Sequence, residues 1–190
     1  VPSVCLGVFD LSVYEMVGAY STFVNKGIWT EPIFITRIED KNGVILENFS
    51  PKTQEAMSEE TANVMVKMLQ GVVDGGTGSR LRHKYGFTNQ MGGKTGTTQN
   101  QSDGWFIGIT PKLVTGVWTG CDDRAAHFRT VLLGQGAHMA LPVFGEYMKR
   151  VYADTAKSGI LPVGFDIPIE INEKFNCVSN SQITENNEFD

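Results

Sequence analysis

Hydrophobic residues recur at helical spacing near the start of the chain. They fall three or four positions apart and so share one helical face: Val13, Met16, Val17, Tyr20 and Val24. Ser12 and Glu15 have the spacing of a capping box, and Gly27 provides a left-handed stop. The pattern predicts a helix over residues 13–24.

Two further stretches show the same periodicity. A second helix is predicted to begin at Ser58 and to end at the glycines that open a loop over 75–82. Its expected buried stripe is Met65, Met68, Leu69, Val72 and Val73. A third helix is predicted over 140–157, with Pro142 in its first turn.

Strand-like runs rich in apolar and β-branched residues separate these helices. They cover 33–39, 44–49, 91–98, 104–110 and 113–120. Asn42-Gly43 predicts a hairpin between the first two runs, and Pro111-Lys112 predicts another between the last two. Glycines recur in the last strands, so another element is expected to pack closely on the sheet. Trp105 and Trp118 are expected to fill the core between the sheet and the last helix.

Composition narrows the classes of protein. The chain has 190 residues, 41% of them hydrophobic, which is enough for one packed domain or most of one. The net charge is −5 without a basic stripe, which argues against nucleic-acid binding. No apolar run is long enough to cross a membrane, so no membrane contact is predicted. The three cysteines include no C-x-x-C pair, so we predict no disulfide framework, metal site or cofactor.

One short motif carries the chemistry. Lys94-Thr95-Gly96 follows a glycine pair and precedes two strands. Gly93-Lys94-Thr95 also matches the end of a phosphate-binding loop. That loop needs a glycine at position 88, where the chain has Thr88, and a helix directly afterwards, where we predict a strand. The context therefore disfavours a phosphate site.

The wider sequence resembles the transpeptidase domain of class A, bifunctional penicillin-binding proteins. In that family K-T-G accompanies the motifs S-x-x-K and S-D-N. The similar blocks occur in family order over roughly residues 3–152: 6–8, 14–16, 19–23, 76–78, 93–98, 103–108, 117–120 and 140–144.

Two motifs of that family are missing. No serine has a lysine three residues later, and no serine or tyrosine has an asparagine two residues later. The S-x-x-K serine is the family's acyl-accepting nucleophile. The resemblance therefore implies the C-terminal portion of the domain over residues 1–157, followed by an extended tail over 158–190.

The resemblance assigns roles to Lys94, Thr95, Gly96 and Thr97. Lys94 would place positive charge beside the substrate carboxylate. The hydroxyls of Thr95 and Thr97 would bind the terminal carboxylate of a D-alanyl-D-alanine stem peptide or of a β-lactam. The Thr97 backbone N–H would donate to the oxyanion, and Gly96 would let substrate lie against the strand. A regular strand sends Lys94 and Thr95 to opposite sides, so a twisted edge is implied.

The resemblance also implies a mixed α/β fold, an antiparallel sheet flanked by helices. Three core strands, three helices and the outlying 33–49 hairpin are expected, with two sheet strands and the nucleophile helix missing. Exposed edges and apolar surface should then make the isolated chain marginally stable or self-associated. The natural partner of that surface would be the missing N-terminal half of the domain.

The function implied is peptidoglycan D,D-transpeptidation by the intact protein, outside the cytoplasmic membrane. This chain would carry the substrate-binding strand and be inactive alone. An alternative is a non-catalytic domain of the same fold that binds wall peptide or a partner protein. A serine β-lactamase relative is a third reading, which the blocks at 103–120 and 140–144 fit less closely.

Overall fold

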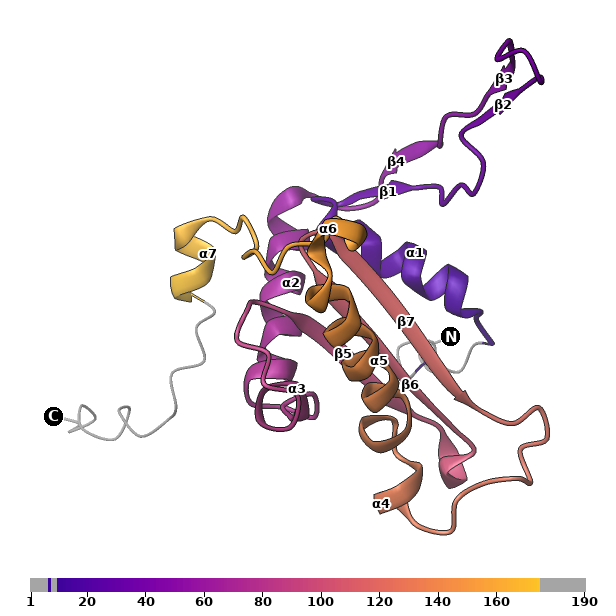
Figure 1. The fold of residues 1–190 in the computed structure, drawn as a ribbon. Coiled ribbons are helices and arrows are strands. Elements are labelled where there is room, and N and C mark those ends of the chain that lie inside the picture. The colour runs from indigo at the N-terminus through magenta and orange to yellow at the C-terminus, as the bar shows by residue number, and fades with distance from the viewer. Residues whose placement is uncertain (1–6, 8–9, 175–190) are drawn as a thin grey trace, which may run out of the picture.

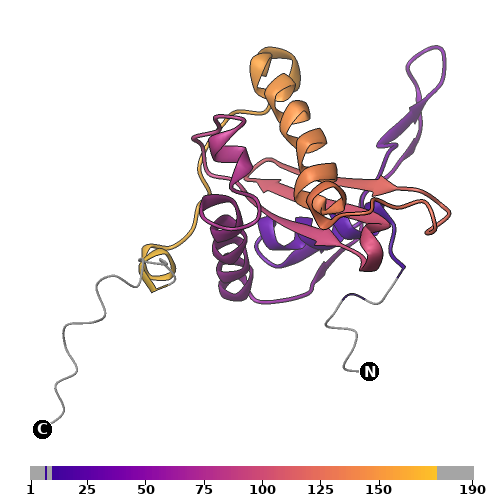
Figure 2. The same ribbon diagram turned by 90° about the horizontal axis from the view of Figure 1, so that it is seen from below.

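Three antiparallel strands form the centre of the computed structural model, which describes all residues except 1–6, 8–9 and 175–190. The strands are β5 (Gly92–Thr97), β6 (Asp103–Thr110) and β7 (Leu113–Gly120), in the order β5-β6-β7. Helix α5 (Gly136–Ala153) covers one face of the sheet (Figure 2). Helices α1 (Val13–Val24) and α2 (Glu59–Asp74) cover the other. The mixed α/β architecture predicted from the sequence is confirmed.

Glycines let the helices approach the sheet closely. Phe106 of β6 and Phe144 of α5 pack with ring centroids 5.0 Å apart. A Cβ at Gly108 would collide with the Phe144 ring. On the opposite face a Cβ at Gly116 would lie 2.8 Å from side-chain atoms of Val13 and of a second α1 valine. The expected close packing on the glycine-containing strands is therefore confirmed.

The two tryptophans lie elsewhere than expected. Side chains alternate along β6, and Phe106 faces α5, so Trp105 points to the opposite face. Trp105 pairs with Trp118 and with Gly96 across the sheet, and Trp118 is 38% exposed. The prediction that both fill the core beneath the last helix is wrong, because Phe106 takes that face.

Both long N-terminal helices begin where the sequence predicts. The Ser12 hydroxyl accepts from the Glu15 amide, and the Glu15 carboxylate accepts from the Ser12 amide, which completes the capping box. At the start of α2 the Ser58 hydroxyl accepts from the Thr61 amide, without the reciprocal bond of a capping box. The predicted stripe of α2 is partly wrong, because Met68 is 59% exposed. The apolar face that packs inward consists of Ala62, Val66, Leu69 and Val73.

Two short antiparallel pairs form an arm that projects from the body (Figure 1). Strands β1 (Ile28–Thr30) and β4 (Thr53–Glu55) pair at its base. Strands β2 (Arg37–Glu39) and β3 (Ile45–Asn48) form the predicted hairpin, although both are shorter than expected. The pairing of β1 with β4 was not predicted, because strands of three residues are too short to show an alternation of apolar and polar residues.

The chain after α2 contains more helix than predicted. Helix α3 (Arg80–His83) lies in the expected loop, and a 3-10 turn, η2 (Gln99–Gln101), follows β5. Helix α4 (Val131–Gly134) precedes α5, which begins four residues earlier than predicted and therefore has Pro142 in its interior.

The segment after α5 is not extended throughout. It contains the short helices α6 (Thr155–Ser158) and α7 (Ile169–Lys174). Between them, Phe165 and Ile167 pack against the cluster formed by Val66, Leu69 and Ile109. These contacts hold residues 159–168 near the body, and helix α7 interrupts the expected extended tail at 169–174. The remainder of the predicted tail, 175–190, lies outside the described residues.

Candidate functional site

The Lys-Thr-Gly motif lies on β5, an edge strand of the described sheet. Its pairing with β6 is unbroken, with Lys94 opposite Ile107 and Thr95 opposite Phe106. Lys94 and Gly96 therefore lie on the α1 and α2 side, whereas Thr95 and Thr97 lie on the α5 side. The ladder does not bring the side chains of Lys94, Thr95 and Thr97 to one face. They share only the free edge of β5, where the two faces meet.

Lys94 is exposed and its amine folds back along the strand. The Nζ atom donates a hydrogen bond of 2.7 Å to the Thr95 carbonyl oxygen. No carboxylate of the described residues lies within ion-pair distance of this amine. An exposed cation with no acidic neighbour is suited to attract an anionic ligand.

The two threonine hydroxyls each have a partner from another element. Thr97 Oγ1 accepts a 2.9 Å hydrogen bond from the backbone N–H of Gly136, at the start of α5. Thr95 Oγ1 lies 2.8 Å from Thr77 Oγ1, in the turn after α2. A Cβ at Gly136 would collide with the Gly96 carbonyl, so only glycine lets α5 begin this close to β5.

These partners were not identified from the sequence. The sequence predicts only a loop over 75–82 and a last helix that begins at residue 140. Glycines on both sides of Thr77 were the available signal for a close backbone approach. Nothing in the sequence indicated which strand residue each group would meet, because both contacts join distant parts of the chain.

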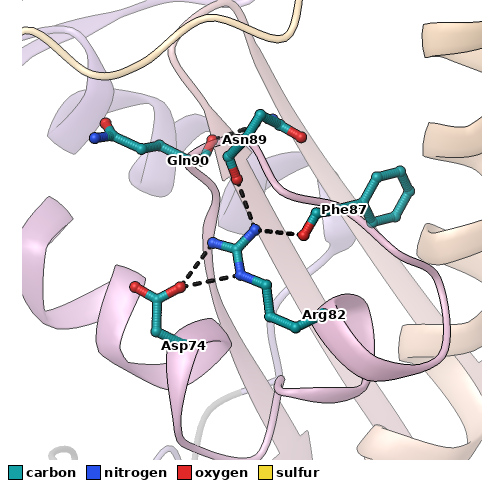
Figure 3. Close-up of polar contacts among 5 residues, drawn as sticks. All are labelled: Asp74, Arg82, Phe87, Asn89 and Gln90. Atoms are coloured by element: carbon teal, nitrogen blue, oxygen red, sulfur yellow. Dashed lines mark hydrogen bonds and ion pairs between the residues drawn. The ribbon is translucent and has the colours of Figure 1, made fainter.

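Arg82 fixes the segment that leads from α2 to β5 (Figure 3). Its Nε and Nη2 donate to the Asp74 carboxylate at 3.0 and 2.7 Å. Its Nη1 donates to the carbonyls of Phe87 and Asn89 at 2.9 and 2.6 Å. A planar guanidinium with several donors suits such a fixed arrangement. Arg82 thus holds together the loop next to the candidate site.

A second tie joins α3 to the start of α5. Arg80 Nη1 donates a 3.1 Å hydrogen bond to the Ala137 carbonyl. The nearby His138 Nδ1 lies 2.8 Å from Nε2 of the Gln135 side chain. Burial and the Arg80 guanidinium lower the pKa of His138 below its usual value. This cluster supports the turn that delivers the Gly136 amide to Thr97.

Within the parts of the chain that the structure describes, no three His, Cys, Asp or Glu side chains gather as they would around a metal ion. Over the same residues no helix has the length and apolar character of a membrane span. The groups that lie along β5 are a cation, two hydroxyls and backbone amides.

Comparison with solved structures places this fold among the penicillin-binding proteins. The crystal structure of penicillin-binding protein 1A from Haemophilus influenzae superposes with a TM-score of 0.68 at 25% identity, over 76% of this chain and 27% of that one. The family model of the penicillin binding protein transpeptidase domain matches residues 3–121. The chain belongs to this family and is part of such a transpeptidase domain.

Curated relatives are class A proteins. Penicillin-binding protein 1A of Aquifex aeolicus is 36% identical over 149 residues, which is 78% of this chain and 20% of that protein. Penicillin-binding protein 1B of Vibrio cholerae is 29% identical over 181 residues, 93% of this chain and 22% of that protein. The chain therefore spans about a fifth of the length of these relatives.

Proposed function

We propose that this chain supplies the carboxylate-binding strand of a peptidoglycan D,D-transpeptidase. The observation that carries the proposal is the exposed Lys94 amine and the Thr95 and Thr97 hydroxyls along one free strand edge. Lys94 provides the charge and the hydroxyls donate to the terminal carboxylate of a stem peptide or a β-lactam. Gly96 leaves room for the ligand backbone to pair with β5.

The reaction itself needs a nucleophile from elsewhere. In the proposed acyl transfer a serine oxygen attacks the carbonyl between the two D-alanines, and the terminal D-alanine leaves. An amine of a second stem peptide then takes the acyl group and frees the serine. The Thr97 backbone N–H is proposed as one donor to the oxyanion. No S-x-x-K motif occurs in this sequence, so we expect the chain alone to be inactive.

The partners follow from the same assignment. The rest of the transpeptidase domain would pack on this chain and bring its serine to the free edge of β5. Stem peptides ending in D-alanyl-D-alanine are the proposed substrate, and β-lactams are the proposed inhibitors. The same proposal implies that the protein acts outside the bacterial cytoplasmic membrane.

Carboxylate binding can be tested on the chain itself by NMR. We expect diacetyl-L-lysyl-D-alanyl-D-alanine to shift the amide signals of β5, and its C-terminal carboxamide to leave them unchanged. Lys94→Met should weaken binding about tenfold, because a charge-assisted contact is lost. Lys112→Met, an exposed lysine in the turn between β6 and β7, is the matched control and should bind normally. Equal shifts with peptide and carboxamide would contradict the proposal.

A further inference from the structure

Thr77 is the residue whose contact most directly affects the candidate site. It is not part of the Lys-Thr-Gly motif and lies 18 positions before Thr95, yet the two hydroxyl oxygens are 2.8 Å apart. Each hydroxyl has one proton to donate, so only one of the pair can donate to the other. Which one does so decides whether Thr95 has a proton left for a ligand.

The neighbouring hydroxyl shows an arrangement that suits an anion. Thr97 accepts from the Gly136 amide, which cannot accept in return, so the Thr97 proton remains free to donate. If Thr77 donates to Thr95, the Thr95 hydroxyl is in the same state. Two hydroxyls, each accepting one hydrogen bond and each with a free proton, would then lie two residues apart on β5.

We propose that Thr77 is a positioning residue that holds the Thr95 hydroxyl ready to donate to a carboxylate. The inference rests on the proposed carboxylate-binding function of β5. Thr77 would not touch the ligand. It would fix the χ1 rotamer of Thr95 and direct its proton away from the protein.

The turn that carries Thr77 is held firmly enough for this role. The Gly78 amide donates to the Val72 carbonyl at 2.9 Å, which folds the turn back onto the end of α2. A Cβ at Gly76 would lie 2.9 Å from the Val72 Cα, so a side chain there would push the turn outward. Just beyond, Arg82 joins Asp74 to the carbonyls that precede β5 (Figure 3). The backbone on both sides of Thr77 is thus tied to the elements that flank the site.

Three variants of the full chain test the proposal. Thr77→Val removes the hydroxyl and keeps the side-chain shape, whereas Thr77→Ser keeps the hydroxyl. Thr88→Val makes the same change at an exposed threonine outside the site. Three-bond scalar couplings to the methyl carbon of Thr95 report its χ1 rotamer without any ligand. Titration with diacetyl-L-lysyl-D-alanyl-D-alanine, with its carboxamide as the control ligand, then reports binding.

We expect a single Thr95 rotamer in the unmodified chain, Thr77→Ser and Thr88→Val, and averaged couplings in Thr77→Val. The dissociation constant for the carboxylate peptide should rise about fivefold in Thr77→Val alone, the size of one neutral hydrogen bond. An unchanged Thr95 rotamer or unchanged affinity in Thr77→Val would overturn the positioning role. If the unmodified chain does not bind the peptide, the proposed function fails, whatever the rotamers show.

Discussion

Single residues decide how closely α5 approaches the sheet, and Gly108 is the clearest case. A Cβ there would overlap the Phe144 ring, which is buried and surrounded by other core side chains. Gly108→Ala should therefore lower the free energy of unfolding by about 1–3 kcal/mol. Urea denaturation followed by tryptophan fluorescence measures the change.

Gly71→Ala is the matched control for that substitution. Gly71 lies inside α2 and a Cβ there would meet nothing within 4 Å. The same glycine-to-alanine change should leave stability unchanged or raise it by up to about 1 kcal/mol, because alanine favours helix. Equal effects at the two positions would contradict the packing account.

His138 should make stability depend on pH. Its folded-state pKa is lowered by burial and by Arg80, so the folded chain binds the proton less readily than the unfolded chain. The stabilisation is present above the unfolded-state pKa of about 6.5 and is lost as the pH falls through that value toward the folded-state pKa. Urea denaturation at several pH values should show that acid lowers the free energy of unfolding less in His138→Gln than in the unmodified chain. Parallel pH profiles for the two proteins would refute this.

At the same scale the sequence predicted the motif but not its surroundings. Lys94, Thr95 and Gly96 could be singled out because the blocks around them resemble the transpeptidase family, while strand and turn signals placed the motif on a strand. The hydroxyl partner of Thr95 and the amide partner of Thr97 come from residues 18 and 39 positions away. Single-sequence patterns carry no information on such distant pairs, which are set by how α2, β5 and α5 pack.

Elements with a strong local signal were predicted well. The capping residues Ser12 and Ser58 set the starts of α1 and α2 because their hydroxyls bind free backbone amides. The start of α5 was placed too late, because Pro142 is usually a first-turn residue and here lies inside the helix. The helix instead begins at Gly136, where contact with β5 outweighs the local preference.

The projecting arm should contribute little to the stability of the body. At the outer hairpin β2 and β3 are exposed along their whole length, and Phe34 beside it is 87% exposed. Replacing residues 35–48 by a short glycine-serine link should therefore change the free energy of unfolding by less than about 1 kcal/mol. Phe144→Ala, by contrast, should cost about 3–5 kcal/mol. A loss of that size from the arm deletion, measured by urea denaturation, would show that the arm supports the fold.

Many large apolar side chains of the described residues are exposed to solvent, and clustered exposed apolar side chains favour association. The large exposed side chains include those at the turn before α5 and on β7: Trp118, Phe128, Val131, Leu132 and Leu133. We therefore expect the isolated chain to self-associate as its concentration rises. Sedimentation velocity over a dilution series measures this, and a stable monomer throughout would contradict it.

The central claim is that this chain holds the carboxylate-binding strand of a transpeptidase whose acylated serine lies outside these 190 residues. The most direct test is the intact mass of the protein after incubation with excess benzylpenicillin. The account predicts an unchanged mass, because no S-x-x-K serine is present. A one-to-one penicilloyl adduct would show that a residue of this chain is the nucleophile and would contradict the account.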